Sequence, residues 1–184
     1  MHAYQSLNNG AAKWVTTDMF DTDENDKIIE HWDVIAAYKE ETVSGHSMID
    51  GATNITDIAR TEENKNIVKH FLTDVLQNGN YQNLPRFIST HQYIQHNPDL
   101  KDGIEAIADY LQSRKAQGKP VRYEHVFKVI GQGNFVVSYC KVTSGDKELA
   151  VFDIFRLENG LIVEHWDNME EIPSKEEWVN SGKF

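Results

Sequence analysis

The sequence predicts an α+β protein in which two helices precede and cover a four-stranded antiparallel sheet. Apolar residues recur at helical spacing within 61–77 and 103–116, and after residue 120 the pattern changes to alternation. Helices followed by a meander of long strands are typical of α+β folds with the helices on one sheet face. The other face must be solvated or covered by a partner. The strands are expected at residues 121–130, 135–142, 148–157 and 161–169.

A partial repeat indicates how the chain is divided. Residues 18–20 (DMF) are followed by 30–33 (EHWD), and residues 153–155 (DIF) are followed by 164–167 (EHWD). Helices and further strands precede only the second copy, so we interpret the first as the end of an incomplete domain. The alternative is a native N-terminal hairpin that merely resembles the C-terminal one. The predicted parts are a partial repeat at 1–43, a linker at 44–58 and a complete domain at 59–184.

The two predicted helices have recognisable ends. Thr61 can cap the first helix, and its first turn carries Glu62 and Glu63, whose charge suits the helix dipole. Gly79 ends this helix and Gly118 ends the second.

Charge and cysteine content argue against several classes of function. The net charge of −11 is unfavourable for binding nucleic acid, which requires Lys and Arg to replace phosphate counterions, and for docking on an anionic membrane. No apolar run approaches the roughly 20 residues that span a bilayer. Cys140 is the only cysteine, which excludes an internal disulfide and a Cys-based zinc site within one chain. The first residues do not resemble a secretory signal, so we expect a cytoplasmic protein.

Strand 148–157 carries the first candidate catalytic residue. Asp153 is the only charged group on a face that is otherwise apolar. A buried carboxylate must be hydrogen-bonded, protonated or in contact with a cavity, and desolvation moves carboxyl groups toward the pKa range of a general acid or base. The alternative is a structural aspartate that anchors a neighbouring backbone or indole N–H. The rest of this face is formed by Leu149, Val151, Phe155 and Leu157.

The turn at Asn159–Gly160 decides which residues of the last strand face Asp153. Asn-Gly favours a two-residue type I′ turn, which places Trp166 opposite Asp153, puts Glu164 on the same face and points His165 away. A three-residue turn would shift the register by one and bring His165 to the Asp153 side. We favour the two-residue turn.

The segment YIQHNP, residues 93–98, supplies the second candidate. His96 could exchange a proton with a substrate or donate a hydrogen bond to a carbonyl group. Alone, such a histidine often only holds a loop in place. A metal site from His96, His165 and Asp153 is the further alternative, but no HExxH spacing supports it and no metal is expected.

Three segments together carry a family resemblance. They are YIQHNP with Gly103 after it, the stretch AVFDIFRLENGLIVEHWD at 150–167, and the helical front end. With these, residues 59–184 resemble the SnoaL-like polyketide cyclases of the nuclear transport factor 2-like superfamily. The motifs fit a subgroup described as predicted aldol-condensation enzymes. The N-terminal hairpin resembles the tail of a second copy.

The resemblance implies a cone-shaped, cystatin-like barrel around a ligand-binding cavity, with homodimers formed through the outer sheet face. In the cyclases, a cavity carboxylate removes a proton α to a carbonyl, and the enolate closes a ring by aldol addition. Asp153 best matches such a base, and His96 could stabilise or reprotonate the oxygen. This chemistry requires no cofactor. The substrate-binding residues are expected to be Tyr93, Phe155, Glu164 and Trp166.

Two functions remain open from the sequence. The first is a cofactor-independent cyclase or isomerase that acts on a carbonyl compound. The second is a non-catalytic module that binds a small apolar ligand, which the truncated front copy mildly favours. Asp153 facing an open cavity would favour the enzyme, whereas a fully hydrogen-bonded Asp153 in a closed core would favour binding or a structural role.

Overall fold

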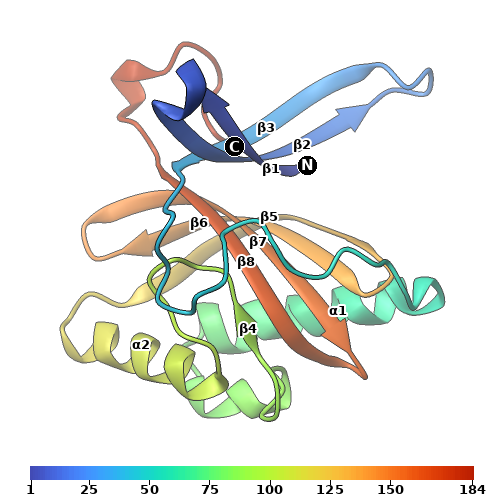
Figure 1. Cartoon of the computed structure of the whole chain (residues 1–184), viewed down its shortest axis with the longest axis vertical. Coiled ribbons are helices and arrows are strands. Elements are labelled where there is room, and N and C mark those ends of the chain that lie inside the picture. The colour runs from blue at the N-terminus through green and yellow to red at the C-terminus, as the bar shows by residue number, and fades with distance from the viewer.

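The computed structural model describes all residues, 1–184, as two packed sheets with helices beneath the larger one (Figure 1). The smaller sheet contains β1 (His2–Leu7), β2 (Ala12–Thr22) and β3 (Ile28–Ala37). The larger sheet is curved and has the strand order β4-β8-β7-β6-β5, with only the β4–β8 pair parallel. Its strands are β4 (Ile94–Gln95), β5 (Val121–Gln132), β6 (Phe135–Ser144), β7 (Lys147–Glu158) and β8 (Leu161–Glu171).

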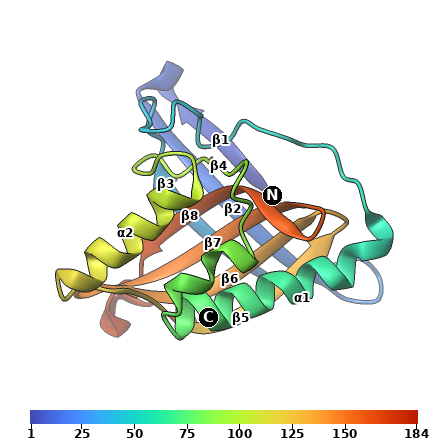
Figure 2. The same cartoon turned by 90° about the horizontal axis from the view of Figure 1, so that it is seen from below.

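The helices lie on the face of the larger sheet that is turned away from the smaller sheet (Figure 2). The first is α1 (Thr61–Phe71), which continues as a π-helical turn through Gln77, and the second is α2 (Ile104–Ala116). None of the helices is long and apolar enough to cross a membrane. The predicted α+β class and both helices are therefore confirmed. Four short 3₁₀ segments complete the elements: Asn8–Gly10, Ile58–Arg60, Tyr81–Arg86 and Lys175–Glu177.

The start of α1 differs from the prediction in one detail. Thr61 is the first helical residue and not the cap, because the 3₁₀ turn at Ile58–Arg60 leads directly into the helix. The Thr61 hydroxyl donates backward to the carbonyl of Ile58 at 2.7 Å.

Two apolar cores hold the layers together. The main core lies between the helices and the inner face of the larger sheet and contains Val68, Phe71 and Leu111 from the helices with Val151 and Phe155 from β7. Burial of such side chains is the main force that holds helices on a sheet. A smaller core joins the two sheets and is formed by Met19, Val34, Tyr139, Ala150 and Phe152.

Asn168 on β8 also joins the two sheets by hydrogen bonds. Its buried amide nitrogen donates to the carbonyls of Val15 and Val34, at 3.1 and 2.8 Å, and to the Thr17 hydroxyl at 3.2 Å. The N-terminal hairpin therefore packs on the outer face of its own chain's larger sheet. The sequence did not predict β1, which adds a third strand to the hairpin.

Residues 44–58, which we call the strap, connect the two sheets and lie against the outer face of the larger one. The backbone of Thr56 exchanges hydrogen bonds with Asn134, one to its side-chain oxygen at 2.8 Å and one from its backbone N–H at 2.9 Å. Gly51 has φ +111° and lies so close to Trp166 that an added Cβ would come within 2.6 Å of the indole. The strap is thus fixed at both its middle and its end.

The sequence repeat is accompanied by the same strand pairing. In β2 and β3, Asp18 faces Asp33 and Phe20 faces His31. In β7 and β8, residues 153 and 155 face 167 and 165 in the same way. His31 bonds to Asp18 at 3.1 Å, as His165 does to Asp153. This match supports the interpretation of residues 1–43 as part of an incomplete copy, which stays a prediction.

A β-bulge in β8 makes the predicted β7–β8 register wrong beyond the turn. The two-residue turn is present, since Glu158 pairs with Leu161. However, Leu157 pairs with Ile162 and Arg156 pairs with Glu164, so Val163 of β8 is an extra residue without a partner. It shifts all later pairs by one. Trp166 therefore lies opposite Ile154, and Asp153 lies opposite Asp167.

Candidate functional site

A small cavity of about 90 Å³ lies between the helices and the inner face of the larger sheet. Fourteen of the nineteen residues that line it are apolar, so a few polar groups determine its chemistry. We call it the inner cavity. Its main polar residues lie on β5, β7 and β8 and in the residues on either side of β4: Tyr93, Asn97, Tyr123, Asp153, His165 and Asp167.

Asp153 is at the centre of this polar group and is only 1% exposed. The Tyr123 hydroxyl donates to its two oxygens at 3.0 and 3.1 Å, and the Ser138 hydroxyl donates to Oδ2 at 3.2 Å. His165 Nε2 lies 3.1 Å from Oδ1. Both carboxylate oxygens are therefore occupied, as expected for a buried charge that must be compensated.

His165 lies between two acceptors. Its Nε2 faces Asp153, and its Nδ1 lies 3.1 Å from the side-chain oxygen of Gln95. Burial lowers the pKa of His165, but the hydrogen bond to Asp153 and the charges of Asp153 and Asp167 raise it by more, so the net pKa lies above its usual value. Both the geometry and the charge favour the imidazolium form.

Asp167 is the less constrained of the two carboxylates. Burial raises its pKa above the usual value, although His165 and a hydrogen bond from Asn97 act in the opposite direction. The Asn97 amide donates to Oδ2 at 2.6 Å, while Oδ1 receives no hydrogen bond. Asp167 lines the inner cavity, so this free oxygen belongs to a carboxyl group that can accept a proton.

Tyr93 supplies a hydroxyl group beside these carboxylates. Burial raises its pKa far above neutrality, so the hydroxyl stays protonated. Its oxygen accepts a weak hydrogen bond from the Gln95 amide at 3.3 Å, and its own proton has no acceptor within the protein. Tyr93, Gln95 and Asn97 alternate along one extended segment. Gln95 contacts both Tyr93 and His165, and Asn97 contacts Asp167.

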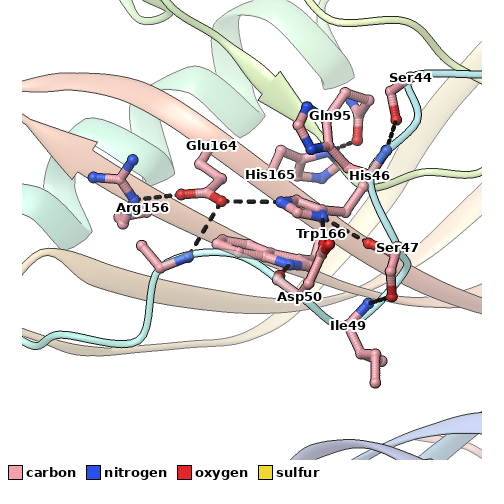
Figure 3. Close-up of polar contacts among 12 residues, drawn as sticks. Ser44, His46, Ser47, Ile49, Asp50, Gln95, Arg156, Glu164, His165 and Trp166 are labelled. Atoms are coloured by element: carbon pink, nitrogen blue, oxygen red, sulfur yellow. Dashed lines mark hydrogen bonds and ion pairs between the residues drawn. The ribbon is translucent and has the colours of Figure 1, made fainter.

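A second polar cluster lies on the opposite face of β8 (Figure 3). Glu164 receives a hydrogen bond from Arg156 Nε at 2.5 Å and lies 2.9 Å from His96 Nε2. Burial raises the pKa of Glu164, but these two partners lower it further, so the carboxyl group stays ionised. We call Arg156, Glu164, His96 and Trp166 the outer cluster.

The outer cluster anchors the strap. His96 Nδ1 lies 2.7 Å from the carbonyl oxygen of Ser47 and 3.0 Å from Asp50 Oδ1. Trp166 stacks on the His96 ring, with centroids 4.5 Å apart, and its indole N–H donates to the carbonyl of Asp50 at 2.7 Å. The cluster therefore has an evident structural role (Figure 3).

The structure divides the predicted site residues between the two faces of the sheet. Asp153, Phe155 and Tyr93 lie together at the inner cavity. Glu164 and Trp166 do not line it, because the bulge at Val163 turns them to the outer face. His96 does not line it either, because it contacts the strap.

Five further inner-site residues were not predicted. His165 and Asp167 are two residues apart in the strand, so they must share a face, and their repetition in EHWD was an available signal. The bulge that selects this face leaves no mark in the sequence. Gln95 and Asn97 could have been found from their alternation with Tyr93. Tyr123 could not, because it comes from a distant strand.

No group of three or more His, Cys, Asp or Glu side chains in the structure is arranged to hold a metal ion.

The curved sheet and its covering helices define the nuclear transport factor 2-like fold. Similar solved structures include a candidate ketosteroid isomerase from Kribbella flavida, with 15% identity over 66% of this chain and 90% of that chain and a TM-score of 0.54. A nuclear transport factor 2-like protein of unknown function from Mesorhizobium loti has 20% identity over 60% and 93% of the chains, with a TM-score of 0.51. A candidate SnoaL-like polyketide cyclase from Jannaschia has 17% identity over 65% and 92%, also with 0.51.

No protein-family model matches the sequence, and no curated protein matches it. The similar solved structures confirm the resemblance to SnoaL-like proteins at the level of the fold. Fold alone does not define an activity, so the function has to be argued from the site.

Proposed function

We propose that the protein binds a small carbonyl compound in the inner cavity and transfers its α-proton without a cofactor, as a cyclase or isomerase. The observation that carries this proposal is the pair formed by Asp167 and Tyr93. Asp167 has a raised pKa and one free oxygen, and Tyr93 has a free hydroxyl proton. A base and a donor in one apolar cavity are the two groups that enolisation requires.

Each polar residue then has a defined role. Asp167 Oδ1 removes the α-proton, and the Tyr93 hydroxyl donates to the carbonyl oxygen as it becomes an enolate. Asn97 and Gln95 orient these two groups through the hydrogen bonds described above. The enolate then attacks a second carbonyl of the same molecule, which closes a ring by aldol addition and leaves an alkoxide that takes the proton from Asp167. Alternatively, the enolate takes the proton back from Asp167 at another carbon. Asp167 returns to the carboxylate in either case.

Asp153 supports the reaction indirectly in this scheme. Its oxygens are occupied by three donors, so it compensates the positive charge of His165 and fixes Tyr123. The role of base, expected at Asp153, therefore passes to Asp167, which lies directly opposite it on β8 and faces the same cavity. The oxygen-side role expected for His96 passes to Tyr93, because His96 contacts the strap across the sheet.

The size of the inner cavity limits the substrate. Ligand sites for drug-sized molecules have volumes of about 300–1,000 Å³. The inner cavity is about 90 Å³, which admits a compound of a few carbon atoms unless α2 moves outward. We therefore propose a short keto acid, ketone or aldehyde as the substrate class. A molecule of this size with one carbonyl group cannot close a ring by aldol addition, so the cavity volume favours the isomerase over the cyclase.

The alternative function is a binding module that does not convert its ligand. The saturated hydrogen bonding of Asp153 favours this alternative, since it is what a structural aspartate requires. The expected homodimer and the cytoplasmic location stay predictions under both proposals.

Exchange of α-protons for deuterium distinguishes the two proposals. The exchange of acetone, pyruvate and acetoacetate in D₂O is followed by proton NMR with the wild type, Asp167→Asn and Asp109→Asn. Asp109 is an exposed carboxylate of α2 and is the matched control. We expect Asp167→Asn to lower the enzymatic rate about 10²- to 10⁴-fold and Asp109→Asn to leave it unchanged. Equal rates for the wild type and Asp167→Asn would exclude Asp167 as the base, and binding without exchange would favour the binding module.

A further inference from the structure

Strand β1 forms an open edge of the smaller sheet, since only its other edge pairs with β2. Just before β1, Met1 and Asp18 exchange two backbone hydrogen bonds, at 2.5 and 2.7 Å. Hydrogen-bonded and non-hydrogen-bonded pairs alternate along antiparallel strands, so every second residue after Met1 bonds to β2 and those between turn their N–H and C=O groups outward. No backbone hydrogen bond from a turn or loop reaches these outward residues. They are His2, Tyr4 and Ser6.

The β1 edge lacks the features by which proteins protect a sheet edge. Charged side chains, proline, bulges and very short strands all discourage pairing with another chain. The sequence contains no Asp, Glu, Lys, Arg or Pro before Lys13, and the six residues of β1 pair with β2 without a register shift. Tyr4 is 37% exposed and Leu7 is 56% exposed, so the strand is accessible to a second chain.

The other edge strands of the two sheets are protected. β5 carries charged side chains, and two register shifts interrupt its pairing with β6. β4 is only two residues long. At β3, the Glu170 carboxylate accepts a hydrogen bond from the N–H of Ile35 at 3.1 Å, and the Lys183 ammonium group donates to the carbonyl of Asp33 at 3.2 Å. β1 is therefore the edge strand on which another strand can be added.

We propose that the chain forms a homodimer in which β1 of one protomer pairs with β1 of its partner, antiparallel about a two-fold axis at Tyr4. In this register each Tyr4 bonds to the partner's Tyr4, and His2 bonds to the partner's Ser6. The two three-stranded sheets then join into one continuous sheet. Although the net charge is −11, like charges do not oppose each other across this pair, because β1 has no acidic or basic side chain apart from His2.

A second copy fits the β1 edge better than it fits the outer face of the larger sheet. The family resemblance implies dimers through that outer face, but in this chain the smaller sheet and the strap cover it. The β1 edge is self-complementary, because a two-fold axis at Tyr4 brings each outward donor of one copy to an outward acceptor of the other. His2 adds no charge near pH 7, since burial lowers its pKa.

A single charge at the axis tests the proposal by sedimentation equilibrium of the full chain. Tyr4→Lys makes each chain less acidic, which by itself favours association, but it places two lysines opposite each other. We expect this variant to weaken the dimer about fivefold or more. Tyr4→Thr, which also removes the ring, and Asn25→Lys, in the exposed β2–β3 turn, should both retain the dimer. A monomeric wild type, or equal dimer affinity in Tyr4→Lys and Asn25→Lys, would overturn the proposal.

Two cysteine variants test the register of the pair. Across the proposed axis, Ala3 forms a non-hydrogen-bonded pair with the partner's Gln5, and such pairs hold their Cα atoms about 4.5 Å apart, within the range of a disulfide. Under mild oxidation, a mixture of Ala3→Cys and Gln5→Cys chains should therefore form a cross-linked dimer, whereas neither variant alone should. The buried Cys140 is common to all samples. No cross-linking in the mixture, or equal cross-linking in the mixture and the single variants, would contradict pairing about Tyr4.

Discussion

Asp153 and Asp167 lie directly opposite each other on β7 and β8, yet their surroundings give them different chemistry. Asp153 receives hydrogen bonds from Tyr123 and Ser138 and contacts a histidine whose charge is favoured. Asp167 receives one hydrogen bond and lies in surroundings that raise its pKa. Two acids whose environments differ in this way can take separate roles in a proton transfer. The difference arises from the donors around each residue and not from the residue type.

The raised pKa of His165 predicts a pH dependence of stability. The folded state holds the proton more tightly than the unfolded state, whose histidine has a pKa of about 6.5. The stabilisation is therefore complete below pH 6.5 and is lost as the pH rises through the higher folded value. We expect the free energy of unfolding in urea to fall between pH 6.5 and 9, and the difference between the wild type and His165→Gln to shrink over the same range. A difference that stays constant or grows with pH would contradict the ion pair with Asp153.

The side chain of Asn168 predicts how firmly the hairpin is held. Its amide nitrogen faces three oxygen acceptors, so Asn168→Asp would replace a shared donor by a carboxylate that repels all three. A buried acceptor left without its donor costs about 1–3 kcal/mol. We expect a loss of stability of at least this size in thermal unfolding and faster proteolysis within residues 1–43. Asn25→Asp, in the exposed β2–β3 turn, is the control with the same chemical change. Equal melting of the two variants would show that Asn168 does not hold the hairpin.

At the scale of elements, the helices and strands were predictable but the site geometry was not. Hydrophobic periodicity defined α1, α2 and the four long strands, because the spacing of apolar residues in a helix or a strand repeats over many residues. Whether Trp166 or His165 faces Asp153 depends on one extra residue, Val163, and a bulge has no reliable local signature. The faces of β7 were assigned correctly because no bulge interrupts its pairing with β6. The π-helical end of α1 and strand β1 were also beyond the pattern.

Two glycines of the strap allow a test of its anchoring on the outer cluster. Gly45 and Gly51 both have positive φ, so alanine at either position is strained by about 1–3 kcal/mol. A Cβ at Gly45 meets nothing within 4 Å, whereas a Cβ at Gly51 would come within 2.6 Å of Trp166 and 3.0 Å of His96. We therefore expect Gly51→Ala to lower the melting temperature clearly more than Gly45→Ala. If the two variants melt alike, the strap is not anchored on the outer cluster.

In the whole molecule, the inner cavity and the outer cluster lie on opposite faces of the same strand, β8. In β8, His165 and Asp167 face the inner cavity while Glu164 and Trp166 face the outer side. One EHWD motif thus supplies groups to both sides of the sheet. In the N-terminal copy, Trp32 occupies the position of Trp166 and packs against the smaller core. Lys128 Nζ lies 4.0 Å from the centroid of its ring, so the tryptophan of this copy still contacts the neighbouring sheet. The half of the motif that would face a cavity, with Phe20 and His31, has no helices over it.

The last prediction concerns the role of the hairpin as a cover. Removing residues 1–43 would expose Tyr139 and Phe152, each 1% exposed in the full chain, and leave the amide of Asn168 without acceptors. An exposed sheet face with this much apolar area favours association with another apolar surface. We therefore expect the truncated chain to melt at a lower temperature and to form a larger assembly than the full chain, by sedimentation equilibrium at matched concentrations. The same sedimentation experiment measures the oligomeric state of the full chain, for which a homodimer is predicted. If truncation changes neither the melting temperature nor the mass of the assembly in units of the chain, the hairpin is a dispensable remnant and the covering role is wrong.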